Sequence, residues 1–68
     1  MGTYIWKVIP YLSEDEPVDS DIYKSEYEAV RFAKKLIRFN SFTEIQFCIV
    51  EKWTEDQTKM IESQRISS

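Results

Sequence analysis

Both alternating faces of the two best strand-like segments, residues 4–12 and 43–53, carry large apolar side chains. Successive side chains of a strand point to opposite faces of the sheet. In residues 4–12, one face carries Tyr4, Trp6 and Val8 and the other carries Ile5, Lys7 and Ile9. In residues 43–53, one face carries Ile45, Phe47, Ile49 and Trp53 and the other carries Cys48 and Val50. Because the chain has only one convincing helical pattern, a single helix must serve both faces. The sequence therefore predicts a sheet with one apolar face that the helix cannot cover.

The helix begins after a capping box. In Ser25-Glu26-Tyr27-Glu28, the Ser25 hydroxyl can accept a hydrogen bond from the Glu28 amide. We predict a helix over residues 26–39, with Asn40 as a left-handed residue that ends it. At 100° per residue its two sides separate cleanly. The apolar side carries Ala29, Val30, Phe32, Ala33, Leu36, Ile37 and Phe39, and the opposite side carries Arg31, Lys34, Lys35 and Arg38.

Two further segments complete the strand pattern. Residues 18–23 alternate in a way that suits a weak edge strand with one wet face. Residues 58–66 fit either a fourth strand in a hairpin with residues 45–53, or a short helix that starts at Thr54. The thin apolar content favours the hairpin. Pro10 has no backbone N–H, so we expect regular strand pairing to end or to bulge there.

These elements predict an α+β fold in a single domain of residues 1–68, with residues 1–3 and 67–68 frayed. A right-handed connection through the helix makes the second and third strands parallel in direction, and the first strand fits between them. In chain numbering, the expected antiparallel sheet has the order 2-1-3, or 2-1-3-4 if the tail is a strand. One amphipathic helix packs on one face.

The composition excludes several classes of function. Cys48 is the only cysteine and there is no histidine, so we expect no disulfide, no zinc site and no cofactor. No base is available to activate Cys48, and no small-molecule substrate or enzymatic activity is expected. The net charge of −3 argues against general nucleic-acid binding. No apolar run could span a membrane, and we expect a cytoplasmic protein.

The uncovered sheet face is therefore the leading candidate for function. It predicts a small, non-enzymatic module that binds a protein partner or itself, either as a homodimer or as a regulator or inhibitor of a larger protein. Large, rigid apolar groups dominate interface energetics. The expected contact residues are Ile5, Ile9, Phe47 and Trp53 on the sheet, with Phe32 and Phe39 on the helix flank. Whether this set or the Trp6, Val8 and Cys48 set faces outward stays open at this level.

The second hypothesis is a role related to nucleic acids, in two opposite forms. The basic helix side (Arg31, Lys34, Lys35, Arg38) could bind phosphate groups. The acidic segment could instead imitate nucleic acid toward a basic protein; its carboxylates are Glu14, Asp15, Glu16, Asp19 and Asp21. Asp19-Ser20-Asp21 also resembles the start of a calcium loop, but the later glycine and glutamate of that loop are missing, and we expect no metal site.

The layout of strand, acidic loop, strand, capped helix and strand resembles that of small phage-encoded inhibitors of host enzymes, and that of many short bacterial proteins. The resemblance covers the order of elements only. It implies a bacterial or phage origin and an inhibitory or binding role, and it assigns no role to any single residue.

Overall fold

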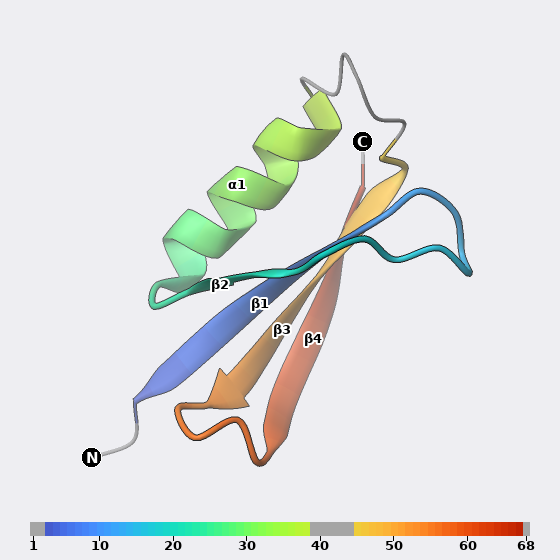
Figure 1. Ribbon diagram of the computed structural model, residues 1–68. Coiled ribbons are helices and arrows are strands. Elements are labelled where there is room, and N and C mark those ends of the chain that lie inside the picture. The colour runs from blue at the N-terminus through green and yellow to red at the C-terminus, as the bar shows by residue number, and fades with distance from the viewer. Residues whose placement is uncertain (1–2, 39–44, 68) are drawn as a thin grey trace.

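The computed structural model describes residues 3–38 and 45–67 and shows a four-stranded antiparallel sheet with one helix on one face (Figure 1). The strand order is β2-β1-β3-β4, which confirms the predicted order with the tail as a strand. The strands are β1 (Tyr4–Tyr11), β2 (Asp21–Tyr23), β3 (Phe47–Thr54) and β4 (Met60–Ser67). The helix, α1, spans Glu26–Arg38.

The capping box begins α1 as predicted. The Glu28 amide donates to the Ser25 hydroxyl at 3.4 Å, and the Ala29 amide donates to the Ser25 carbonyl at 3.1 Å. The Ser25 hydroxyl satisfies one of the N–H groups that lack an intrahelical partner in the first turn, and the bond from Ala29 is the first regular intrahelical bond. Phe39 and the predicted terminator Asn40 lie outside the described residues.

The main core lies between α1 and the sheet. Val8, Cys48 and Val50 point from the central strands toward Ala29 and Ala33 of α1, and all five are almost completely buried. Small side chains on both surfaces let the helix approach the sheet closely. Each buried valine contributes about 1.5–3 kcal/mol relative to an exposed one. The helix therefore covers the face that carries Trp6, Val8 and Cys48.

The expectation that strand pairing ends or bulges at Pro10 holds on the β2 side, where the β1–β2 register ends at Val8, and is wrong on the β3 side. Pro10 pairs with Cys48, and the β1–β3 register continues without a shift to Tyr11 and Phe47. The Pro10 carbonyl accepts a hydrogen bond from the Val18 amide at 2.9 Å, so the backbone groups of Pro10 point away from β3. A residue at such a position needs no N–H toward that neighbour. The irregularity lies instead between Lys52 and Trp53, where the β3–β4 register shifts.

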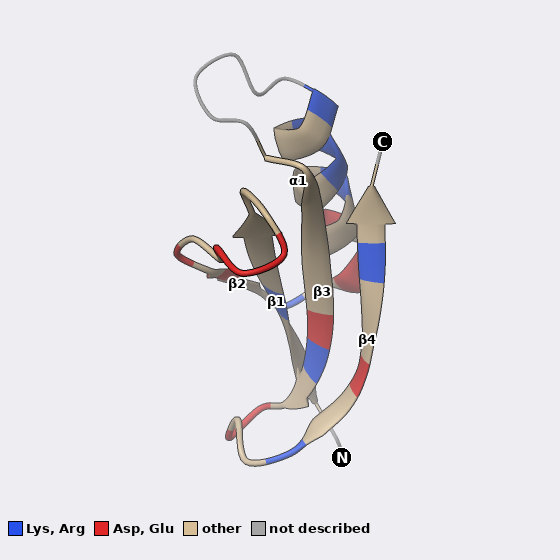
Figure 2. Ribbon diagram, turned by 90° about the vertical axis from the view of Figure 1, so that its right-hand side faces the viewer, with Lys and Arg blue, Asp and Glu red and all other residues tan. Residues whose placement is uncertain are grey.

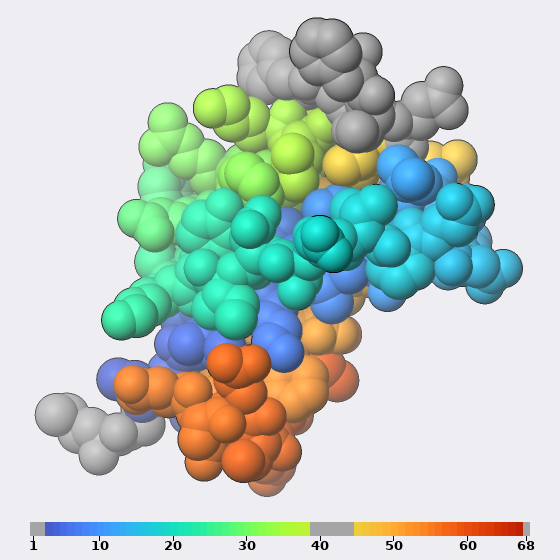
Figure 3. Space-filling view, in the orientation of Figure 1, coloured from blue at the N-terminus to red at the C-terminus, as the bar shows by residue number. Residues whose placement is uncertain are grey.

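The acidic segment closes into a tight turn. The Leu12 amide donates to the Glu16 carbonyl at 2.9 Å, and the Glu16 amide donates to the Ser13 carbonyl at 3.1 Å. Beyond this turn, Pro17 forms an isolated antiparallel bridge with Tyr11. The segment is thus the end of a hairpin, and β2 itself covers only the last part of the strand predicted over residues 18–23. The turn stands out from the side of the molecule (Figure 3).

The β3–β4 hairpin is closed by a network around Asp56. One of its carboxylate oxygens accepts from the hydroxyl groups of Thr54 and Thr58, at 2.6 and 2.8 Å, and from the Thr58 amide at 3.2 Å. Gln57 has a φ of 59°, in the left-handed region. This network replaces the helical alternative, in which Thr54 would have capped a helix over the same residues.

Candidate protein-binding face

The sheet face away from α1 is built by alternate residues of all four strands, and Figure 2 shows this face with α1 behind the sheet. The register places Ile5 opposite Trp53, Ile9 opposite Ile49, and Tyr11 opposite Phe47. The predicted sheet residues Ile5, Ile9, Phe47 and Trp53 therefore share one face, and it is the one that the helix leaves uncovered. Among the described helices and strands, α1 alone packs against the sheet, and it lies on the other side.

Two of these residues are buried, although they lie on the helix-free face. Ile5 and Phe47 are each only 6% exposed. The Tyr11 ring stacks on the Phe47 ring, with centroids 4.8 Å apart, and the Arg65 guanidinium lies 4.0 Å from the Phe47 centroid. A partner would therefore touch the covering groups more than Ile5 or Phe47 themselves. Ile9, Ile49 and Trp53 remain half-buried and offer more surface.

A polar group divides this apolar face at its centre. Lys7 lies opposite Glu51 in the β1–β3 register. The Lys7 ammonium sits 4.7 Å from the centroid of the Trp53 ring, and the Trp53 indole N–H donates to the Glu51 carboxylate at 3.0 Å. The cation and the hydrogen bond fix the orientation of the indole. The face therefore presents a rigid aromatic group between two opposite charges.

The face is bordered by exposed apolar residues of the outer strands. Ile22 of β2 lies opposite Lys7 and is 50% exposed. Met60 of β4 lies opposite Trp53 and is 45% exposed, and the adjacent Ile61, at the β3–β4 register shift, is 42% exposed. Sequence reasoning placed Lys7 on the Ile5 and Ile9 face but did not select it, Tyr11, Glu51, Ile22 or Ile61 as contact residues. Tyr11, Lys7 and Glu51 follow from alternation along the central strands, whereas the place of Ile22 depends on the register of β2, which the sequence does not give.

Of the two predicted helix-flank residues, the structure describes only Phe32. Phe32 is half-buried and packs against Tyr23 of β2, with ring centroids 5.3 Å apart. This contact ties α1 to the edge of the sheet. Burial raises the pKa of the Tyr23 hydroxyl above its usual range, with smaller contributions from the carboxylates of Asp21 and Glu28. Phe39, the other flank residue, lies outside the described residues.

The two charged surfaces are both exposed and lie on different elements. Arg31, Lys34, Lys35 and Arg38 are on the outer side of α1. Glu14, Asp15, Glu16, Asp19 and Asp21 are exposed along the β1–β2 hairpin. Figure 2 shows the acidic positions on the β2 side of the sheet and most basic positions of α1 on the β4 side. Over residues 3–38 and 45–67, no group of three or more acidic or cysteine side chains is arranged to hold a metal ion.

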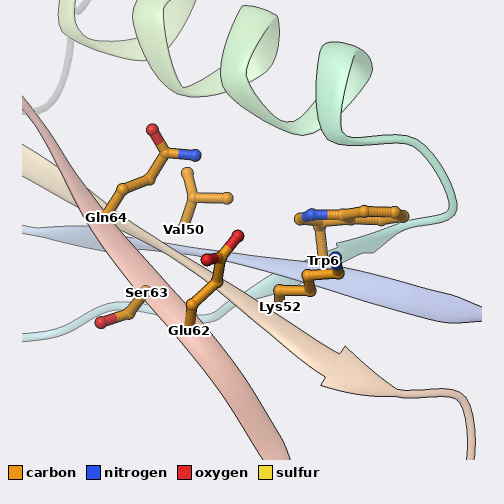
Figure 4. A pocket seen from close by; sticks show the side chains of 6 residues that line it. All are labelled: Trp6, Val50, Lys52, Glu62, Ser63 and Gln64. Atoms are coloured by element: carbon orange, nitrogen blue, oxygen red, sulfur yellow. The ribbon is translucent and has the colours of Figure 1, made fainter.

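A pocket of about 240 Å³ opens on the helix side of β3 and β4 (Figure 4). It is lined by Trp6, Val50, Lys52, Glu62, Ser63 and Gln64. The indole nitrogen of Trp6 is buried, and it has no hydrogen-bond partner among the described residues. In Figure 4 this nitrogen is on the side of the ring that faces Gln64 and Val50. Buried donors are nearly always paired, so this N–H is an unused hydrogen-bonding group.

Cys48 is a core residue in this structure. Its side chain is completely buried, and its thiol lies 3.8 Å from the Ala33 carbonyl. Burial raises the pKa of the Cys48 thiol to about 11. A neutral, inaccessible thiol is a poor nucleophile.

Comparison with protein-family models, with curated proteins and with solved structures gives no significant match for this chain. No helix within the described part of the chain has the length and apolar character needed to cross a membrane.

Proposed function

We propose that this protein is a small, non-enzymatic module that binds another protein chain through the helix-free face of its sheet. The observation that carries the proposal is the set of apolar side chains that β1 and β3 present on this face. Ile9, Ile49 and Trp53 offer surface at its centre, and the half-exposed Ile22 and Ile61 lie at its borders. Apolar surface that no element of the same chain covers is typical of protein interfaces.

The Lys7, Glu51 and Trp53 group supports the same proposal. Interface hot spots are enriched in tryptophan, and charges beside them provide specificity more than affinity. Here the indole is held in place by a hydrogen bond on one side and a cation on its ring. A partner with complementary polar groups would be distinguished from one that is only apolar.

The first partner to test is a second copy of the chain. We expect the solution mass, measured by light scattering over a hundredfold range of concentration, to rise toward that of a dimer. The variant with Ile22→Glu and Ile61→Glu places charges at both borders of the face, and it should stay monomeric. Tyr27→Glu is the matched control, because Tyr27 is a 72% exposed apolar residue on α1.

Two results would count against this form of the proposal. A monomeric wild-type protein at every concentration would exclude self-association, and the function would then require a different protein partner. A dimer that the Ile22→Glu and Ile61→Glu changes leave intact would place the interface elsewhere on the molecule.

A further inference from the structure

The two edges of the sheet differ in their ability to accept another strand. β2 forms one edge and spans only three residues. It begins with Asp21, and a second aspartate, Asp19, lies two residues before it. Short, charged edges resist pairing. β4 forms the other edge, spans eight residues without a proline, and is exposed except at Ile66. The open edge of the sheet is therefore that of β4.

The direction of the β4 backbone groups follows from the register. The Pro10 carbonyl points toward the Val18 amide and away from β3, so the backbone groups of its partner Cys48 point away from β1, toward β4. Cys48 lies opposite Ile66, and Val50 lies opposite Gln64. By alternation, the N–H and C=O groups of Ser63 and Arg65 point outward. Their spacing fits the backbone of one more extended chain.

The helix-side surroundings of this edge favour acidic side chains. Phe32 faces β2 through its contact with Tyr23. At 100° per residue, Val30 and Lys34 lie on the opposite flank of α1, over β4, whereas Lys35 lies on the β2 flank. Gln64, Lys34 and Lys35 all border one groove that runs along α1. Figure 2 shows most basic positions of α1 on the β4 side of the sheet.

Gln64 also borders the pocket that contains the unpaired Trp6 N–H. A residue added opposite Gln64 would have its side chain on the helix side of the sheet. At that position the side chain would lie between the Lys34 ammonium and the mouth of the pocket. The pocket contains a donor, the Trp6 N–H, that has no acceptor among the described residues. Glu62 lines the same pocket and limits the negative charge that the site can take.

From these four observations we propose that the outer edge of β4 binds an extended peptide segment that carries an acidic side chain opposite Gln64. The backbone of the segment pairs with Ser63 and Arg65, and its carboxylate lies on the Lys34 side of α1, at the mouth of the pocket that contains the Trp6 indole. This site is separate from the helix-free face, and its existence does not depend on the function proposed for that face.

The direct test is a titration of the isotopically labelled protein, followed by NMR. The probe is a short capped peptide in which glutamate alternates with valine, and the control peptide has lysine in place of glutamate. We expect the backbone amides of Ser63 and Arg65 and the indole N–H of Trp6 to shift. We expect the lysine peptide to bind more weakly than the glutamate peptide, by a factor of up to about five.

Matched variants separate the site from general electrostatics. Lys34→Glu and Lys35→Glu change the same charge on the same helix, but only Lys34 faces β4. Lys34→Glu should weaken binding of the glutamate peptide about fivefold, and Lys35→Glu less than about twofold. Trp6→Phe keeps an aromatic ring, removes the N–H, and should change binding less than about twofold, because Trp6 lies on β1, two strands in from β4.

Ser63→Pro tests the backbone assignment. A proline is tolerated on an edge strand where its missing N–H faces solvent. The variant should therefore keep its circular dichroism and unfolding midpoint and lose peptide binding; a variant that unfolds would show that the Ser63 N–H points to β3 and would overturn the proposal. Equal effects of Lys34→Glu and Lys35→Glu on peptide binding would also overturn the proposal. So would the absence of NMR shifts at about 1 mM peptide, or NMR shifts confined to residues of the helix-free face. That last result would instead favour the function proposed for that face.

Discussion

Trp6 combines a packed ring with an unpaired polar atom. Its ring lies against the core on the helix side, while its indole N–H has no hydrogen-bond partner among the described residues. A buried donor without an acceptor costs about 1–3 kcal/mol, which offsets part of what the ring contributes. The ring and the N–H therefore act on the stability in opposite directions.

We predict that Trp6→Phe lowers the free energy of unfolding by less than about 1 kcal/mol, because the loss of ring area is offset by removal of the unpaired N–H. Trp6→Ala should cost about 3–5 kcal/mol. Urea unfolding of the two variants measures the difference. If Trp6→Phe costs as much as Trp6→Ala, the indole N–H has a protein partner that this account omits.

Cys48 gives a second prediction, through its ionisation. In an unfolded chain a thiol ionises near pH 8.5, whereas in the folded protein burial raises the pKa of the Cys48 thiol to about 11. Between these values only the unfolded chain loses the proton. The Cys48 contribution to stability is thus fully present below about pH 8.5 and is lost as the pH rises toward about 11.

The measurement compares wild type with Cys48→Ala from pH 7 upward. The difference in unfolding free energy between the two proteins should shrink as the solution becomes alkaline, because the alanine variant lacks this ionisation. Native Cys48 should also react with a thiol reagent far more slowly than the unfolded chain. A constant difference across this range, or rapid labelling of the native protein, would show that Cys48 is accessible.

At the scale of elements, the β3–β4 hairpin shows where local sequence is decisive. The tail could be either a strand or a short helix, and the thin apolar content favoured the strand. The structure confirms it, because Asp56 collects the hydroxyl groups of Thr54 and Thr58 into a turn, with Gln57 left-handed. Aspartate and threonine favour such turns through side-chain to backbone hydrogen bonds.

The Asp56 network predicts a pH dependence of stability. Hydrogen bonds from the Thr54 hydroxyl, and next from Thr58, lower the pKa of the Asp56 carboxyl below its usual range. Its contribution to stability is therefore present above the pKa of the unfolded chain, about 3.9, and is lost as the pH falls through the lower folded value. Asp56→Asn should remove this part of the acid sensitivity, and Asp15→Asn, in the other hairpin, should not. Thermal unfolding followed from neutral pH into acid tests both variants, and an equal response of the two would exclude the turn as the cause.

At the scale of the whole molecule, the sequence predicted the strand order and the single helix, but it left open which sheet face α1 covers. Both faces are apolar, so hydrophobic pattern alone cannot choose between them. The structure suggests that size decides: Val8, Cys48 and Val50 are small enough for α1 to approach through Ala29 and Ala33. Phe47, Trp53 and Tyr11 on the other face would hold a helix farther away, and close packing is worth more than a loose contact.

The candidate site was predictable only in part, for the same reason. Alternation placed Ile5, Ile9, Phe47 and Trp53 on one face, and the register of the central strands agrees. The lateral cover of Phe47 by Tyr11 and Arg65 depends on the detailed pairing of three strands. The border residues Ile22 and Ile61 depend on the registers of the outer strands. Short strands with few apolar residues do not specify register by their pattern.

The central claim is that the helix-free face binds a protein. Its most direct test is quantitative capture of binding proteins, including added copies of the chain itself, by three immobilised forms: wild type, the Ile22→Glu and Ile61→Glu variant, and the Tyr27→Glu control. The account predicts that wild type and the control capture the same proteins in the same amounts, while the double variant loses them. If the double variant captures everything that wild type does, the helix-free face is not the binding surface.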